Sequence, residues 1–155
     1  PTFNGTIPPY FQDSESEVLG VPAEADWHKA KLDPDMGRVA NGVPLDGSDI
    51  FAYSFKTPTV RNIALTAPYM HNGVYETLEE VVRFYNVGGG DGIGIHLENQ
   101  TLPFDNLNLS QREVDDLVTF MEALTDTMGM TAVPTRLPVF PEDLPYAKRV
   151  VGGKY

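Results

Sequence analysis

The sequence contains no cysteine. This absence excludes disulfide bonds, thiolate metal sites and thioether attachment of a prosthetic group through this chain. A run of about 18 apolar residues is also missing, so the sequence predicts no membrane-spanning helix. The histidines are His28, His71 and His96, and their spacing is too wide for a zinc motif. For His28 and His96 we expect positions on the surface or in loops.

Basic residues are scarce, because 11 Lys and Arg stand against 22 Asp and Glu, which gives a net charge of −11. A nucleic-acid partner is therefore excluded as a working hypothesis, since a phosphate backbone requires a positive surface. The same charge disfavours an anionic membrane surface. It suits a basic protein partner, although solubility alone also accounts for it.

Glycine and proline are abundant, with 14 and 13 copies. They interrupt every apolar stretch up to about residue 57, which predicts a long ordered loop there and no strong strand pattern. Aromatic side chains are scattered along this loop. An aromatic-rich loop of this length needs a large apolar body to lie against. The aromatic residues concerned are Phe3, Tyr10, Phe11, Trp27, Phe51, Tyr53 and Phe55.

Two amphipathic helices are predicted after this loop. Thr77 and Glu80 form a capping box, and the glycine run 88–90 ends the first helix. Apolar residues then recur on one face and place Tyr85 in the last turn, pointing inward. The second helix begins at Ser110 and is expected to bury a stripe. The first face comprises Leu78, Val81, Val82 and Tyr85, and the second Val114, Leu117, Val118, Met121 and Leu124.

Three further segments have a predicted backbone. Asn72-Gly73 is expected to form a turn. Residues 57–63 are expected to form a short helical turn with Pro58 at its first position. From residue 125 onward, four prolines predict an extended tail that wraps over a surface. The glycine run 88–94 does not match a phosphate-binding loop, because it follows a helix and lacks the Lys-Ser/Thr ending.

The segment 55–73 reads FKTPTVRNIALTAPYMHNG and closely resembles a signature of bacterial di-haem cytochrome c peroxidases and MauG-like proteins. The resemblance extends to DMGR at 35–38, to TLEEVVRFYN at 77–86 and to the helix at 110–124. It implies a mainly α, cytochrome-c-like domain with long ordered loops. In this family the matching segment follows the Cys-x-x-Cys-His motif of the C-terminal domain, which this sequence lacks.

The resemblance therefore implies one incomplete domain over residues 1–155. It divides into a loop-rich part at 1–57, a core at 58–124 and an extended tail at 125–155. Haem c would be attached through another segment or chain. The first residue, Pro1, suggests a processed chain or a fragment.

Tyr85 is the residue that the resemblance points to as an axial ligand of the haem iron. It lies nineteen residues after Thr66, where the peroxidases carry a methionine and MauG-type enzymes a tyrosine. A phenolate is a hard anionic ligand that stabilises ferric and higher oxidation states. The alternatives are a buried tyrosine with a hydrogen-bonded hydroxyl, or ligation by Met70, fifteen residues earlier.

Other family positions carry weaker implications. The backbone carbonyls of Thr66 and Pro68 match ligands of a calcium ion between the two domains, although an ordinary turn also explains them. His71 matches a histidine near the haem edge, where it would bind a propionate or relay protons. It is equally interpretable as a structural histidine. Arg61 and Arg38 could pair with haem propionates or with acidic residues of this chain.

The implied function is peroxide-dependent oxidation, with electron transfer through c-type haem. One alternative is a non-catalytic electron-transfer or structural subunit of a larger cytochrome assembly, and another is a haem-free binding module. The expected partners are the haem-bearing remainder of the protein and a redox protein. Because covalent haem is attached outside the bacterial cytoplasm, the family implies a periplasmic or secreted location.

Overall fold

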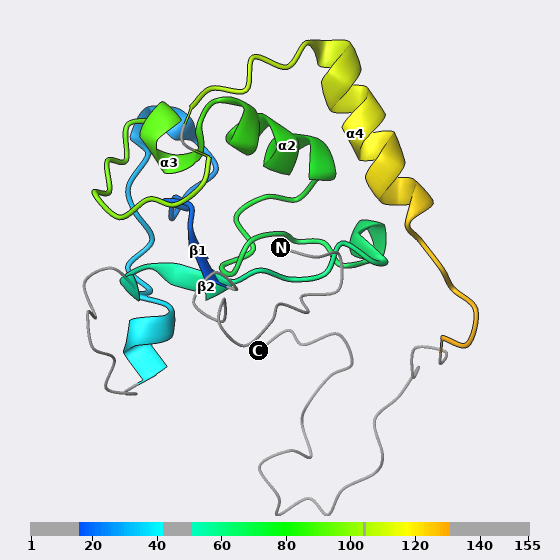
Figure 1. Ribbon diagram of the computed structural model, residues 1–155, viewed down its shortest axis with the longest axis horizontal. Helices are drawn as coiled ribbons and strands as arrows, with labels where there is room; N and C mark the ends of the chain where they lie inside the picture. Colours follow the sequence, from blue (N-terminus) through cyan, green and yellow to red (C-terminus); the bar gives the residue numbers. More distant parts are fainter. Residues whose placement is uncertain (1–15, 42–50, 104, 131–155) are drawn as a thin grey trace, which may run out of the picture.

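The computed structural model describes residues 16–41, 51–103 and 105–130 (Figure 1). Most of these residues lie in loops, and the longest regular elements are two helices. The elements in chain order are β1 (Ser16–Val18), η2 (Trp27–Lys29), η3 (Arg38–Asn41), β2 (Ser54–Lys56), η4 (Ile63–Leu65), α2 (Leu78–Asn86), α3 (Gly89–Gly92) and α4 (Gln111–Ala123). None of the helices in these ranges is long and apolar enough to span a membrane.

A pair of short strands runs through the segment predicted to be loop. β1 pairs antiparallel with β2, and Val18 lies opposite Ser54. Val18 is buried, and the Ser54 hydroxyl donates to the Phe51 carbonyl at 2.7 Å. The prediction of an uninterrupted loop was wrong here. Each strand has only three residues, which is too short for alternation to be visible in the sequence.

Helix α2 begins as the sequence predicts. The Thr77 side chain accepts a hydrogen bond from the Glu80 N–H, and the Glu80 side chain accepts one from the Thr77 N–H. The buried face of α2 differs from the predicted stripe. Phe84 lies outside that stripe and is fully buried, whereas Val81 and Tyr85 are only partly buried. The helix packs against α4 and against the loop around Val21, so it is covered on more than one side.

The glycine run after α2 is more than a helix terminator. Gly89–Gly92 form a single helical turn, α3, where the sequence predicted a loop. The Gly90 N–H donates to the Leu19 carbonyl at 2.8 Å, and the Gly90 backbone lies directly against Gly20. The Gln100 amide donates to the carbonyls of Gly88 and Pro103. The missing side chains therefore allow two distant backbone segments to touch.

Helix α4 begins with the predicted capping box at Ser110, and its predicted buried stripe is only partly confirmed. Val114 is buried and Leu117 is 41% exposed, whereas Val118, Met121 and Leu124 are half-buried. The helix contacts α2 and η4, and no other helix or strand in the described ranges covers its apolar face as closely. Helical periodicity in the sequence identifies an apolar face but does not say what covers it.

The predicted helical turn at 57–63 is also shifted. The observed turn, η4, begins after Asn62, whose φ of 56° lies in the left-handed region and interrupts any helix running from Pro58. The Asn62 N–H donates to the Leu124 carbonyl at 3.2 Å, and its side-chain oxygen accepts from the Asp126 N–H at 2.6 Å. Asn62 thus holds the end of α4 against η4.

Three predictions concern residues outside the described ranges. They are the proline-rich tail beyond Met130, the aromatic positions before Ser16, and the start of the chain.

We predict that Gly90→Ala lowers the free energy of unfolding by about 2–4 kcal/mol, because the new methyl group would overpack a tight backbone contact. An added Cβ would lie 2.7 Å from the Gly20 Cα. Gly94→Ala is the control, since Gly94 has a φ of 91° but no atom within 4 Å of its Cβ position. Urea unfolding should show a cost of about 1 kcal/mol for this control, from backbone strain alone. Equal costs for the two variants would contradict the overpacking argument.

Candidate functional site

The centre of the described structure is a small apolar cluster of Val21, Tyr75 and Phe84. Both candidate haem ligands, Tyr85 and Met70, pack against it. They come from different parts of the chain, because Tyr85 lies on α2 and Met70 in the turn that precedes it. The structure therefore brings the Tyr85 oxygen and the Met70 sulfur, the two ligand candidates from the sequence, to one apolar surface.

Tyr85 lies in the last turn of α2, with its ring edge-on to Phe84 at a centroid distance of 6.0 Å. Burial, together with the nearby Glu17 carboxylate, raises the pKa of its hydroxyl to about 12. This hydroxyl has no hydrogen-bond partner among the described residues. The alternative of a buried tyrosine with a hydrogen-bonded hydroxyl therefore requires a partner outside the described residues.

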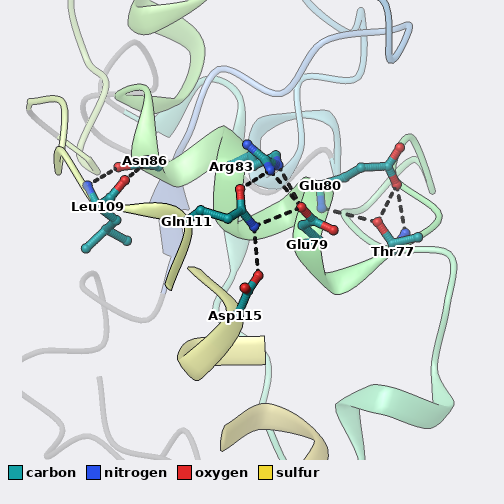
Figure 2. Close-up of polar contacts among 8 residues, drawn as sticks. All are labelled: Thr77, Glu79, Glu80, Arg83, Asn86, Leu109, Gln111 and Asp115. Atoms are coloured by element: carbon teal, nitrogen blue, oxygen red, sulfur yellow. Dashed lines mark hydrogen bonds and ion pairs between the residues drawn. The ribbon is translucent and has the colours of Figure 1, made fainter. Parts of the chain in front are cut away.

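Asn86 fixes the end of α2 next to Tyr85 (Figure 2). Its side-chain amide donates to the Leu109 carbonyl at 3.1 Å, and its side-chain oxygen accepts from the Leu109 N–H at 2.8 Å. Its backbone carbonyl accepts from the Leu107 N–H at 2.9 Å. These three bonds join the last turn of α2 to the segment that leads into α4, so the Tyr85 backbone has little freedom to move.

A surface network joins the other face of α2 to α4 (Figure 2). Arg83 pairs with Glu79 at 2.7 Å and also bonds Gln111, which in turn donates to Asp115 at 2.7 Å. Hydrogen bonds from Arg83 and then Gln111 lower the pKa of Glu79. Because these side chains are exposed, the network contributes little free energy. The network nevertheless links the two helices along their exposed sides.

Met70 and His71 lie in a tight turn. The Tyr69 N–H donates to the Tyr75 carbonyl at 2.7 Å, and the Gly73 N–H donates to the Met70 carbonyl at 3.3 Å. The predicted turn at Asn72-Gly73 is confirmed. Met70 has a φ of 68°, a backbone conformation that L side chains rarely adopt. The turn thus directs Met70 toward the apolar cluster at a conformational cost.

The His71 ring is held from two directions. It stacks on Phe55 with a centroid distance of 3.6 Å, and its Nε2 lies 3.4 Å from an oxygen of Asp33. The Asn72 amide bridges the other Asp33 oxygen and the Pro22 carbonyl, both at 2.9 Å. These contacts favour the interpretation of His71 as a structural histidine. Sequence reasoning missed Asp33 and Asn72, because only the folded chain brings them together.

The same contacts change the pKa of the Asp33 carboxyl group. Burial by itself would raise its pKa, but hydrogen bonds from the Asn72 amide, the Asp35 N–H and His71 outweigh burial, so the pKa lies below its usual value of 3.8. The carboxylate therefore remains charged at neutral pH and orients His71.

The remaining predicted site residues lie elsewhere. The Arg38 guanidinium sits 4.9 Å from the centre of the Phe51 ring, and Arg61 is exposed. Thr66 and Pro68 are also exposed, and the Thr66 hydroxyl donates to the Ile63 carbonyl at 2.9 Å. In the described ranges, no group of three or more acidic, His or Cys side chains could hold a metal ion. A calcium ion bound by backbone carbonyls would not appear in such a group.

The described residues fit one side of a haem. They supply an apolar surface and two donors that haem iron accepts, a phenol and a thioether. Since the chain has no cysteine, the covalent attachment would have to come from other residues.

Comparison with known proteins identifies relatives of this chain among cytochrome c peroxidases and MauG proteins. No family model matches the chain. The chain is 44% identical over 84 residues to the cytochrome-c peroxidase IdrP1 of Denitromonas iodatirespirans, covering 54% of this chain and 21% of that protein. It is 40% identical over 124 residues to the methylamine utilization protein MauG of Methylorubrum extorquens, covering 80% of this chain and 31% of MauG. The chain belongs to the cytochrome c peroxidase and MauG family.

Solved structures of related proteins have a similar fold. A MauG-like protein associated with microbial copper homeostasis is 32% identical, with a TM-score of 0.54 over 72% of this chain and 33% of that one. A tyrosine-to-methionine variant of the di-haem peroxidase BthA from Burkholderia thailandensis has a TM-score of 0.55 over the same shares, at 24% identity. This chain therefore spans about a third or less of the length of these family members.

We predict that Asp33→Asn makes the stability of the protein less sensitive to acid. A carboxyl group whose folded pKa is depressed stabilises the fold above its usual pKa of 3.8, and this contribution disappears as pH falls through the folded pKa. Wild-type protein should therefore lose more unfolding free energy than the variant below about pH 4. Denaturant unfolding at several pH values measures this. Asp105→Asn, an exposed site, is the control, and it should retain the wild-type acid sensitivity.

Proposed function

We propose that this chain covers the distal face of a c-type haem held by other residues of the protein, and that Tyr85 is an axial ligand of its iron. The supporting observation is the Tyr85 hydroxyl itself. It is presented by a rigid helix end on an apolar cluster, burial raises its pKa, and no described residue bonds it. Membership of the cytochrome c peroxidase and MauG family supplies the group it would bind.

The electrostatics of Tyr85 are consistent with this role. Without a cation, burial and the Glu17 carboxylate both hold the phenol in its neutral form. A nearby iron would reverse this balance, because a bound cation favours the deprotonated form of its ligand. Under this proposal, Tyr85 would be a phenolate only with the iron beside it. Bound in this way, the haem would supply storage of oxidising equivalents in place of simple electron acceptance.

Met70 is the alternative ligand. It packs against the same cluster, and thioether sulfur is a common haem ligand. Its left-handed backbone conformation would be explained by a need to place the side chain there. A methionine ligand would favour ferrous iron and raise the reduction potential, so the two alternatives predict different spectra.

We assign the other residues more peripheral roles in this proposal. His71, stacked on Phe55 and oriented by Asp33, would stand at the haem edge as a positioned donor. Arg38 and Arg61 would pair with propionates, as bidentate donors do with carboxylates. The carbonyls of Thr66 and Pro68 would contribute to a calcium site shared with another domain.

For the whole protein, we propose peroxide-dependent oxidation with electron transfer through c-type haem in a periplasmic or secreted setting. The names of the relatives, cytochrome-c peroxidase and MauG, support this class of reaction. The haem-bearing remainder of the protein would be the primary partner, and a redox protein would be the electron partner. A non-catalytic electron-transfer subunit is the alternative, and it would show a haem that is inert to peroxide.

We predict that Tyr85→Phe in the haem-bearing protein removes the ferric tyrosinate bands of the absorption spectrum and raises the reduction potential, because an anionic ligand is lost. Tyr53→Phe is the control, since Tyr53 lies outside the apolar cluster. Met70→Leu should leave the spectrum unchanged. A spectrum that responds to Met70→Leu and not to Tyr85→Phe would assign the ligand to Met70. Absence of any haem in the purified native protein would contradict the proposal altogether.

A further inference from the structure

An unbroken series of aromatic contacts leads from Tyr85 to Trp27. The Tyr85 ring is edge-on to Phe84 at 6.0 Å, and Phe84 is tilted against Tyr75 at 5.5 Å. The indole N–H of Trp27 then donates to the Tyr75 hydroxyl at 3.1 Å. Phe84 and Tyr75 are fully buried, whereas Trp27 is only partly buried. The series therefore runs from the candidate haem ligand through the core to the edge of the described structure.

We propose that Trp27, the only tryptophan of the sequence, is a redox-active residue that gives one electron to the haem after the haem has been oxidised by peroxide. This inference rests on the proposed function, because it needs a haem at the apolar cluster. It does not need Tyr85 to be the ligand, since Met70 contacts the same cluster.

Trp27 is better suited than Tyr75 to hold the oxidised state. A phenol that loses an electron at neutral pH must also lose its proton. Tyr75 has no acceptor for that proton among the described residues, and burial raises its pKa to about 12. An indole can be oxidised to a radical cation that keeps its proton. The Tyr75 oxygen that accepts the Trp27 N–H would then stabilise the positive charge through a stronger hydrogen bond.

Phe84 is too difficult to oxidise to hold the charge itself, so it serves as the medium between Tyr85 and Tyr75. The close ring spacing keeps each gap within van der Waals contact, the range in which electron tunnelling is efficient.

The step is balanced without breaking a bond. The Trp27 indole would lose one electron and become its radical cation, with its N–H proton kept in the hydrogen bond to Tyr75, and a peroxide-oxidised haem, when bound, would accept that electron. A one-electron donor then reduces Trp27 from the surface. The net result is that an oxidising equivalent moves from the buried haem to an accessible side chain, where a donor too large to enter the core can be oxidised.

The test uses the haem-bearing protein that contains this chain, treated with hydrogen peroxide in the absence of a donor. Electron paramagnetic resonance should show an organic radical that narrows when tryptophan carries ring deuterium, and peptide mapping should find oxidation at Trp27. Trp27→Phe should lose both signals and slow the oxidation of ferrocyanide. Its resting haem spectrum should match that of the wild type, and Tyr53→Phe should behave as wild type throughout.

A second variant separates the hydrogen bond from the ring series. Tyr75→Phe keeps the ring contact with Phe84 and removes only the acceptor of the Trp27 N–H. We expect the tryptophan radical to form in lower yield and to decay faster. A radical of unchanged yield in Trp27→Phe would overturn the proposal. An unchanged haem spectrum in Tyr85→Phe would remove the ligand assignment and leave the role of Trp27 intact, whereas a native protein without haem would overturn both.

Discussion

Burial of Phe84 is the interaction on which the rest of the described structure depends. Its side chain has no solvent exposure and contacts Tyr75 and Tyr85. Full burial of such a ring contributes roughly 1.5–3 kcal/mol, a large share of the stability of a chain that is mostly loop. It also sets the rotation of α2 about its axis, and that rotation determines where the neighbouring Tyr85 hydroxyl points. Core packing and the candidate site are therefore one feature.

The elements around this cluster are held together by side-chain amides more than by regular secondary structure. Asn86 joins α2 to the segment before α4, Asn72 joins the Met70 turn to Asp33, and Gln100 closes the glycine run. Asn62 does the same for the end of α4. Each amide pairs backbone groups that no helix or strand satisfies, which a loop-rich fold requires. Long ordered loops can remain in place around a large cofactor for this reason.

The arrangement separates two kinds of chemistry. Tyr85 and Met70 meet the apolar cluster, where a ligand to iron would be desolvated. His71 and Asp33 form a polar pair in which the carboxylate stays charged. An oxidised haem beside the first group would be insulated from water but connected to Trp27 by rings. In this proposal, the same aromatic residues that stabilise the fold carry the electron.

The sequence by itself determined both capping boxes, the turn at Asn72-Gly73, the place of Tyr85 in the last turn of α2 and the family, because these features depend on residues within a few positions of one another. Only the tertiary structure decided that β1 pairs with β2, that Gly90 touches Gly20, that α4 leaves Leu117 exposed and that His71 meets Asp33. Each of these depends on which segments far apart in the chain meet in the fold. Their free energy comes from packing and desolvation, which local propensity does not encode.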